Sequence, residues 1–178
     1  MISAEAISVA IRELPSVSET AFKSAMRTLA SGVCVVTSRH RGVINGMTAT
    51  AVCSVAAMPP MVLVVVNRCN RSHALIRDGD GFTLNVLSAD QAWLAQQFAS
   101  RAAEPFASIT IGEGVTGCPV IDQCGTVLEC VLASSYDVAT HTIFVGRVVA
   151  SRQSGLPPLL YHDGQFGTMA CGERRHHG

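Results

Sequence analysis

The chain has 178 residues, of which 48% are hydrophobic and 15% charged, and its formal net charge at pH 7 is zero. This length suits one domain built around one core. The balanced charge removes the electrostatic case for nucleic acid or an anionic membrane surface as a partner. No apolar run approaches the roughly 18 residues that span a bilayer. The low charged fraction predicts apolar surface that a partner covers, most simply a second copy of the chain.

The seven cysteines include no CxxC pair, a pattern that argues against structural zinc and predicts no bound metal. Cys34, Cys53 and Cys130 lie among Val and Leu, so we expect them to be buried as small hydrophobic side chains. The N-terminus lacks the basic start and apolar block of a signal peptide. Free buried thiols without an export signal predict a cytoplasmic protein.

Patterning divides the chain into three segments. Residues 1–17 are weakly patterned and are expected to form an arm or extension, residues 18–170 form the domain, and residues 171–178 form a polar tail. Ser16 and Glu19 resemble a capping box at the start of an amphipathic helix, whose apolar residues recur at i, i+3, i+4 and i+7. Gly32 is the expected C-cap of that helix.

Strands dominate the rest of the chain. The run Met61–Val66 is continuously apolar, which predicts a strand buried on both faces. Helical patterns are few and short. Most predicted strands are separated by turns too short for a parallel crossover, so the sequence predicts a mainly β fold with an antiparallel barrel and a few peripheral helices. The predicted strands cover residues 33–39, 48–54, 61–66, 82–86, 126–134 and 142–151.

The stretch 46–72 carries the least ordinary composition. Thr48, Ala49, Thr50 and Ser54 place small and hydroxyl side chains in a strand where a core would favour Val. Small side chains let a flat ligand lie close to the backbone, and hydroxyls donate to ring heteroatoms or phosphate. On residue types alone, a hairpin with a polar edge is the more common explanation of such a pattern.

A polar cluster follows the buried strand of this stretch and precedes a helical turn. Backbone N–H groups at the turn, a hydroxyl and a guanidinium would suit a phosphate group. A solvated loop explains the same residues equally well. The cluster consists of Asn67, Arg68, Arg71 and Ser72.

Two further motifs carry less information. Gly112–Gly117 matches GxGxxG, but Cys118-Pro119 and strand-like sequence follow it, so it is expected to be a loop and not a dinucleotide fingerprint that opens a helix. The histidines show no zinc-binding spacing. His141 begins a predicted strand, and on residue type alone it is a turn histidine.

Taken together and in order, four blocks resemble the flavin reductase family of short NAD(P)H:flavin oxidoreductases. They are GVCVVTSRHRGVINGMTATAVCSVAAMPPMVLVVVNRCNRS, FTLNVLSADQAWLAQQFAS, GTVLECVLASSYDVATHTIFVGRVV and PPLLYHDGQF. The resemblance runs from Phe22 to Phe166. It implies an FMN-binding split β-barrel, a homodimer, FMN or FAD against the barrel, NADH or NADPH as hydride donor, and a monooxygenase component as the recipient of reduced flavin.

The resemblance also implies roles for individual residues. His141 would lie near the nicotinamide, and Tyr161 would close the site. The residues expected along the isoalloxazine ring and ribityl chain are Thr48, Ala49, Thr50 and Ser54. The residues expected to hold the phosphate end are Asn67, Arg68 and Ser72. Two departures from the family pattern concern the nicotinamide more than the flavin: Ala139-Thr140 replaces Gly-Asp, and His162 follows Tyr161.

The implied reaction is hydride transfer from C4 of the nicotinamide to N5 of the flavin, for which the protein supplies stacking, alignment and electrostatics. Other functions fit the same residues. Some relatives keep their flavin and reduce another acceptor, such as a cobalt corrinoid. A flavin- or haem-binding module without turnover is a second alternative, and a purely structural dimer is a third.

Overall fold

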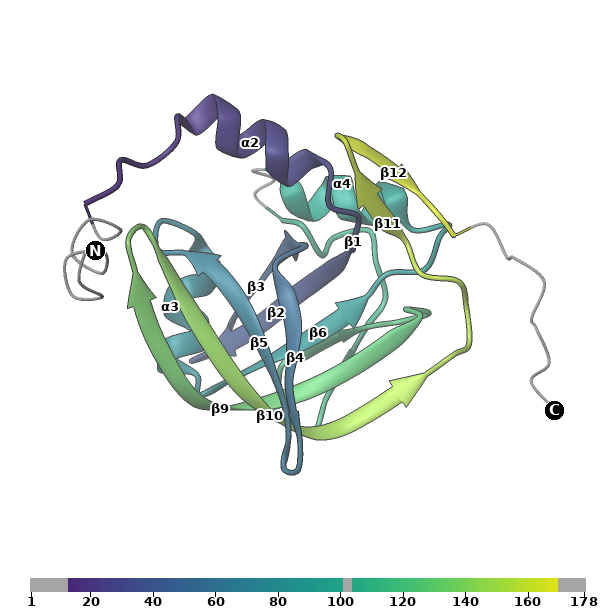
Figure 1. The fold of residues 1–178 in the computed structure, drawn as a ribbon. Helices are drawn as coiled ribbons and strands as arrows, with labels where there is room; N and C mark the ends of the chain where they lie inside the picture. Colours follow the sequence, from purple (N-terminus) through teal and green to yellow (C-terminus); the bar gives the residue numbers. More distant parts are fainter. Residues whose placement is uncertain (1–12, 101–103, 170–178) are drawn as a thin grey trace, which may run out of the picture.

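The computed structural model describes residues 13–100 and 104–169 (Figure 1). The first twelve residues of the predicted arm and the whole predicted tail lie outside these ranges, as does Cys171. Within the described ranges the strands far outweigh the helices, and every pairing between strands is antiparallel. The predicted mainly β, antiparallel architecture is therefore confirmed.

A seven-stranded sheet in the order β3-β2-β6-β9-β10-β5-β4 forms the body of the molecule. The two edge strands, β3 and β4, follow one another in the chain and are joined by Thr50 and Ala51, so the sheet curls into an open barrel (Figure 1). The strands are β2 (Cys34–His40), β3 (Val43–Ala49), β4 (Val52–Ala57), β5 (Pro60–Asn67), β6 (Gly81–Val86), β9 (Thr126–Val138) and β10 (His141–Gln153).

Smaller elements cover the barrel. A three-stranded sheet pairs β1 (Ser31–Gly32), β11 (Leu160–His162) and β12 (Gln165–Gly167). The hairpin of β7 (Ile111–Glu113) and β8 (Pro119–Ile121) contains the GxGxxG match, and no helix follows it, which confirms that the motif is a loop. The helices in the described ranges are α2 (Glu19–Arg27), α3 (Arg71–Asp78) and α4 (Ala92–Ala99).

The barrel interior is filled by alternating side chains of its strands. Val62, Val64 and Val66 of β5 are buried together with Phe82 and Phe144, whereas the intervening β5 residues are only half-buried. The expectation that this run is buried on both faces was therefore wrong. An apolar run packs one face of an antiparallel strand in the core and leaves the other against partly covering elements.

A second core lies between the sheet and α4. Leu94, Ala95 and Phe98 of α4 pack against a cluster that includes Val33 and Val35. The packing places α4 beside β3, and the two elements are in direct contact. The helix therefore packs next to the small-residue stretch.

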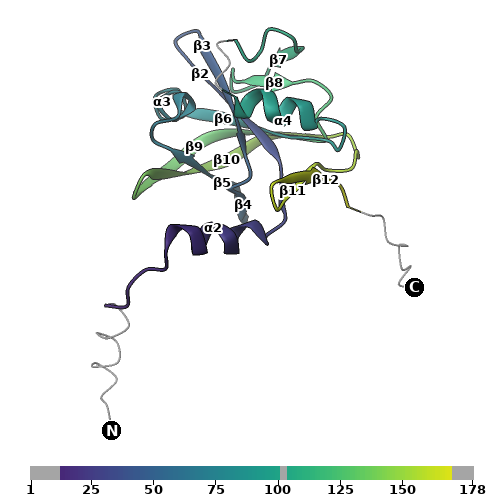
Figure 2. The same ribbon diagram turned by 90° about the horizontal axis from the view of Figure 1, so that it is seen from above.

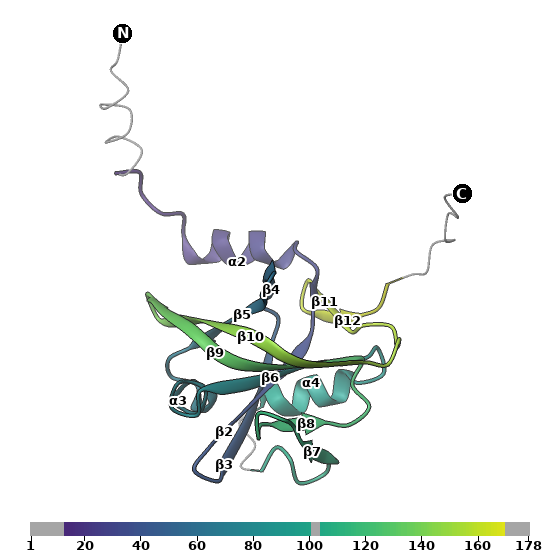
Figure 3. The same cartoon turned by 90° about the horizontal axis from the view of Figure 1, so that it is seen from below.

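Helix α2 stands off the barrel on the side away from α3 and the β7–β8 hairpin (Figures 2 and 3). No residue of α2 is buried. Phe22 and Met26 on the helix and Leu29 just after it are about half exposed. Its N-cap is Ser18, and the helix ends at Arg27, so the predicted cap residues Ser16 and Gly32 were wrong. Within the described ranges, no helix is long and apolar enough to cross a membrane.

The predicted burial of three cysteines is confirmed for two of them and wrong for Cys53. Cys34 and Cys130 are buried, and burial raises the pKa of each thiol to about 12. Cys53 is exposed, because its strand β4 is an edge of the sheet and only Val52 in it is half-buried. A run of small apolar residues on an edge strand therefore does not imply burial.

Candidate functional site

The small-residue stretch forms the end of one strand, a two-residue link and the next strand, instead of the single predicted strand. Thr48 donates its hydroxyl to the Ala95 carbonyl of α4 at 2.6 Å, and Ala49 is buried in the barrel core. Thr50 and Ser54 are exposed, and neither hydroxyl has a hydrogen-bond partner within the described ranges. The hydroxyls free to meet a ligand are therefore those of Thr50 and Ser54.

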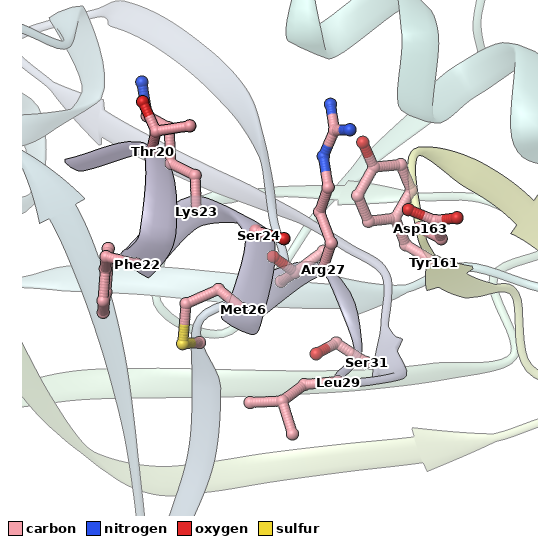
Figure 4. Close-up of a pocket in the computed structure, with 11 residues that line it drawn as sticks. Thr20, Phe22, Lys23, Ser24, Met26, Arg27, Leu29, Ser31, Tyr161 and Asp163 are labelled. Carbon is pink, nitrogen blue, oxygen red and sulfur yellow. The ribbon is translucent and has the colours of Figure 1, made fainter. Parts of the chain in front are cut away.

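A cavity of about 690 Å³, here called the α2 cavity, lies between α2 and the end of β3 (Figure 4). It brings Thr50 together with Tyr161 of β11, two residues that are far apart in sequence. Tyr161 is 38% exposed and packs against Phe166 with ring centroids 5.4 Å apart. The remaining lining residues are Thr20, Phe22, Lys23, Ser24, Met26, Arg27, Leu29, Ser31 and Asp163.

A second cavity of about 500 Å³, here called the α3 cavity, lies along residues 45–47 of β3. Its walls come from β3, from the loop that leads into α3, and from the C-terminal end of α4. The first turn of α3 lines it, and a helix N-terminus favours negative charge. The lining residues are Asn45, Gly46, Met47, Asn67, Cys69, Asn70, Arg71, Phe98, Ala99, Ser100 and Pro105.

Polar side chains shape the loop that enters α3. Asn70 caps the helix by accepting from the Ser72 N–H at 2.9 Å, and Asn67 accepts from the Cys69 N–H at 2.9 Å. Ser72 is fully buried, and its hydroxyl bonds to the Asn45 side-chain amide at 2.8 Å. The side chains of Asn67 and Ser72 thus build the loop whose backbone lines the cavity.

The β9–β10 hairpin closes over the same loop. The Arg68 guanidinium donates to the Ala139 carbonyl and lies 3.9 Å from the Asp137 carboxylate. The backbone N–H of Arg68 donates to the Thr140 carbonyl at 3.1 Å. His141 pairs with Asn67 across the β10–β5 ladder, and its Nδ1 lies 2.9 Å from the Thr140 hydroxyl. The structure therefore brings Asn67, Arg68 and His141 together at one end of the barrel.

A buried hydrogen-bond chain supports this arrangement. The Thr142 hydroxyl donates to Asp137 Oδ1 at 2.6 Å, so it can only accept from His73 Nε2, which lies 2.8 Å away. His73 is therefore the Nε2–H tautomer. Burial lowers the pKa of His73, and the charge of Arg77 acts in the same direction. The neutral imidazole connects α3 to the hairpin that carries His141.

The predicted residues form two groups connected by β3. Thr50 and Tyr161 line the α2 cavity, and Asn67 lines the α3 cavity. Arg68, Ser72 and His141 are close to Asn67 in the chain or in the sheet but line neither cavity. Met47 lines the α3 cavity and Thr50 the α2 cavity, and three residues of extended chain span on the order of 10 Å. Thr48 and Ala49 lie between the two cavities. Ser54 lines neither cavity.

Several lining residues were not predicted. Thr20, Lys23 and Arg27 are spaced i, i+3 and i+7, so the sequence held the signal for one polar face on α2. Asp163 and Asn45 offered no comparable spacing. Their contributions depend on a β-turn and on a strand register that only the folded chain reveals. Within the described ranges, no group of three or more His, Cys, Asp or Glu residues could hold a metal ion.

Comparison with known proteins identifies the family. Residues 26–170 match the model of the flavin reductase like domain. The chain is 39% identical over 146 residues to the reductase component of a 4-nitrophenol 4-monooxygenase/4-nitrocatechol 2-monooxygenase from Rhodococcus opacus, covering 82% of this chain and 78% of the relative. It is 36% identical over 171 residues to an FMN reductase (NADH) from Pseudomonas syringae, covering 94% of this chain and 91% of the relative.

Solved structures give the same result. An NADH:FAD oxidoreductase from Streptomyces globisporus, in complex with NAD and FAD fragments, superposes with a TM-score of 0.82 at 28% identity, covering 89% of this chain and 97% of that one. The styrene monooxygenase flavin reductase from Pseudomonas putida S12 superposes with a TM-score of 0.78 at 25% identity, covering 85% and 98%. The fold is thus the split barrel that these reductases share. The chain belongs to the flavin reductase family.

Proposed function

We propose that the domain over residues 18–170 is an NAD(P)H:flavin oxidoreductase, which takes a hydride from NADH or NADPH and supplies reduced flavin to a monooxygenase component. The observation that carries the proposal is the match of residues 26–170 to the family model. The relatives named as reductase components of monooxygenases support this assignment of the partner.

The residues present fit a flavin nucleotide. Such a ligand has a planar apolar ring at one end and a phosphate at the other, and β3 connects an apolar, hydroxyl-bearing cavity with a cavity at a helix N-terminus. Both volumes fall within the roughly 300–1,000 Å³ typical of small-molecule sites. When bound, the flavin supplies the hydride acceptor. Thr48, Ala49, Thr50 and Ser54 are proposed to lie along its ring and ribityl chain.

The phosphate end is assigned to the α3 loop. The N-terminal end of the α3 dipole favours negative charge, and Arg71 is exposed at the cavity wall. The N–H groups of Cys69, Asn70, Ser72 and His73 bond within the loop. Asn67 and Ser72 act by holding this backbone in place through the hydrogen bonds described above. Arg68 contributes positive charge while its guanidinium also holds the β9–β10 hairpin.

His141 is proposed to align the nicotinamide. Its Nδ1 is bonded to the Thr140 hydroxyl, whereas Nε2 has no hydrogen-bond partner within the described part of the chain. A fixed ring with one free nitrogen can hydrogen-bond a carboxamide and hold the dihydropyridine in register. Tyr161 is proposed to close the ring end of the site from the wall of the α2 cavity.

A homodimer and a cytoplasmic location complete the proposal. The exposed apolar residues Val55 and Met58 on the β4–β5 hairpin offer a surface for a second copy. All cysteines in the described ranges are free thiols, as a reducing compartment maintains.

An oxygen-free assay with both flavins and both nicotinamide dinucleotides tests the proposal. We expect NADH absorbance at 340 nm and flavin absorbance near 450 nm to fall together in equal molar amounts. Absence of turnover with every pair of substrates would refute it and leave a flavin-binding module. The variant His141→Ala is expected to raise the KM for NADH more than it weakens flavin binding. A collapse of flavin affinity at unchanged KM would refute the role of His141.

A further inference from the structure

We propose that Arg27 is the anion anchor of the α2 cavity and binds a phosphate of the nicotinamide dinucleotide. This inference rests on the proposed function and adds a binding residue to it. Arg27 is the last residue of α2 and lines the cavity together with Thr50 and Tyr161. Its signal in the sequence is the i, i+3, i+7 spacing with Thr20 and Lys23.

The backbone of Arg27 is fixed to the opposite wall of the cavity. Its carbonyl accepts from the Asp163 N–H at 3.1 Å, in the turn between β11 and β12. Figure 4 shows the Arg27 side chain extending toward the side of the cavity where Tyr161 and Asp163 lie. Because the fixing bond is made by the main chain, a substitution at position 27 changes the guanidinium and leaves the helix attached to the turn.

Among the residues that the structure describes, no carboxylate forms an ion pair with Arg27. Lys23, the other cation of this wall, pairs with Glu19 one turn earlier. Across the described residues, Arg27 has neither an ion pair nor a side-chain hydrogen bond. A planar guanidinium with all of its donors free is the side chain best matched to the paired oxygens of a phosphate.

The other face of the cavity is apolar. Phe22, Met26 and Leu29 point away from Arg27 in Figure 4 and provide contacts for flat rings. A nicotinamide dinucleotide consists of two ring systems joined by a pyrophosphate, so it requires an apolar wall and an anion site in one cavity. The proposed site of the flavin phosphate is at the α3 loop, which lines the separate α3 cavity. The anion at Arg27 is therefore assigned to the hydride donor.

The experiment compares Arg27→Gln and Arg27→Lys with the wild type, and uses Arg77→Gln as a matched control that removes one exposed guanidinium of α3. Donors are NADH and N-benzyl-1,4-dihydronicotinamide, which has no phosphate. Acceptors are FMN and riboflavin, which also has none. Calorimetric titration of NAD⁺ into flavin-free protein measures affinity without turnover.

For Arg27→Gln we expect the KM for NADH and the Kd for NAD⁺ to rise about tenfold, the loss of one charge-assisted contact, with kcat within about twofold. Arg27→Lys restores part of the loss, and Arg77→Gln behaves as wild type. The KM for the benzyl donor stays unchanged with either flavin.

An unchanged Kd for NAD⁺ in Arg27→Gln overturns the inference, as does an equal loss with the benzyl donor. A loss that appears with FMN but not with riboflavin also overturns it, because the anion would then be the flavin phosphate. A wild type that binds NAD⁺ in an Arg27-dependent way but oxidises no NADH refutes the proposed function and leaves the anion anchor standing.

Discussion

The substitution Gly46→Ala tests how tightly β3 is packed against α4. A Cβ at this position would lie 2.5 Å and 2.7 Å from Phe98 Cε1 and Cδ1, and 3.3 Å from Phe106 Cζ. The Phe98 ring is 4% exposed and packs edge-on against Phe106 with ring centroids 5.1 Å apart, so a shift of the ring disturbs that contact. Overpacking of this kind costs about 1–3 kcal/mol of unfolding free energy.

For a chain of this size, each kcal/mol shifts Tm by roughly 2–4 °C, so we expect Tm to fall by about 2–12 °C. Because Gly46 and Phe98 both line the α3 cavity, flavin affinity should fall as well. Urea denaturation measures the change in unfolding free energy. In the double variant Gly46→Ala, Phe98→Leu, the smaller side chain should recover part of the loss, which a double-mutant cycle detects as coupling. Unchanged stability in Gly46→Ala, or strictly additive losses in the double variant, would refute the packing argument.

Three further predictions concern hydrogen bonds and titration. Thr48→Val removes the bond to the Ala95 carbonyl and should cost about 1 kcal/mol in urea denaturation, and no loss would show that the bond is dispensable. Burial places the folded-state pKa of His73 below the 6.5 of the unfolded chain, so its stabilising contribution is present above that pH and is lost as pH falls through the folded value. His73→Gln should therefore show a smaller fall in Tm below pH 6.5 than the wild type, and parallel curves would contradict this. In the native protein at pH 8, iodoacetamide should modify the exposed thiols of Cys53 and Cys69 quickly. It should modify the buried thiols only after denaturation, and these are Cys34, Cys118, Cys124 and Cys130. Rapid labelling of the buried thiols in the native protein would count against the fold.

Much of the fold could be predicted from periodicity and turn chemistry. The strands alternate with a period of two, and the connections between them were too short for parallel crossovers, which indicated an antiparallel barrel. The GxGxxG match was correctly assigned to a loop because Pro119 follows it and begins a strand. The exact helix ends were wrong at α2, where Ser18 rather than Ser16 accepts the capping hydrogen bond from Ala21.

The site was only partly predictable. Hydroxyl residues in β3 and polar residues after β5 could be seen in the sequence, but their partners could not. Thr48 bonds to α4 and Ser72 to Asn45, and both partners are more than 25 residues away. The α2 cavity combines a helix near the N-terminus, a link between two strands and a hairpin near residue 161. Such a juxtaposition follows from the sheet topology, which no local pattern encodes.

The central claim is that the flavin ring rests at the end of β3, where Thr50 lines the α2 cavity. A crystal structure of the protein soaked with FMN measures this directly. We predict the ring in van der Waals contact with residues 48–54 and the phosphate at the first turn of α3. A ring bound elsewhere on the barrel, or a phosphate remote from α3, would contradict the account.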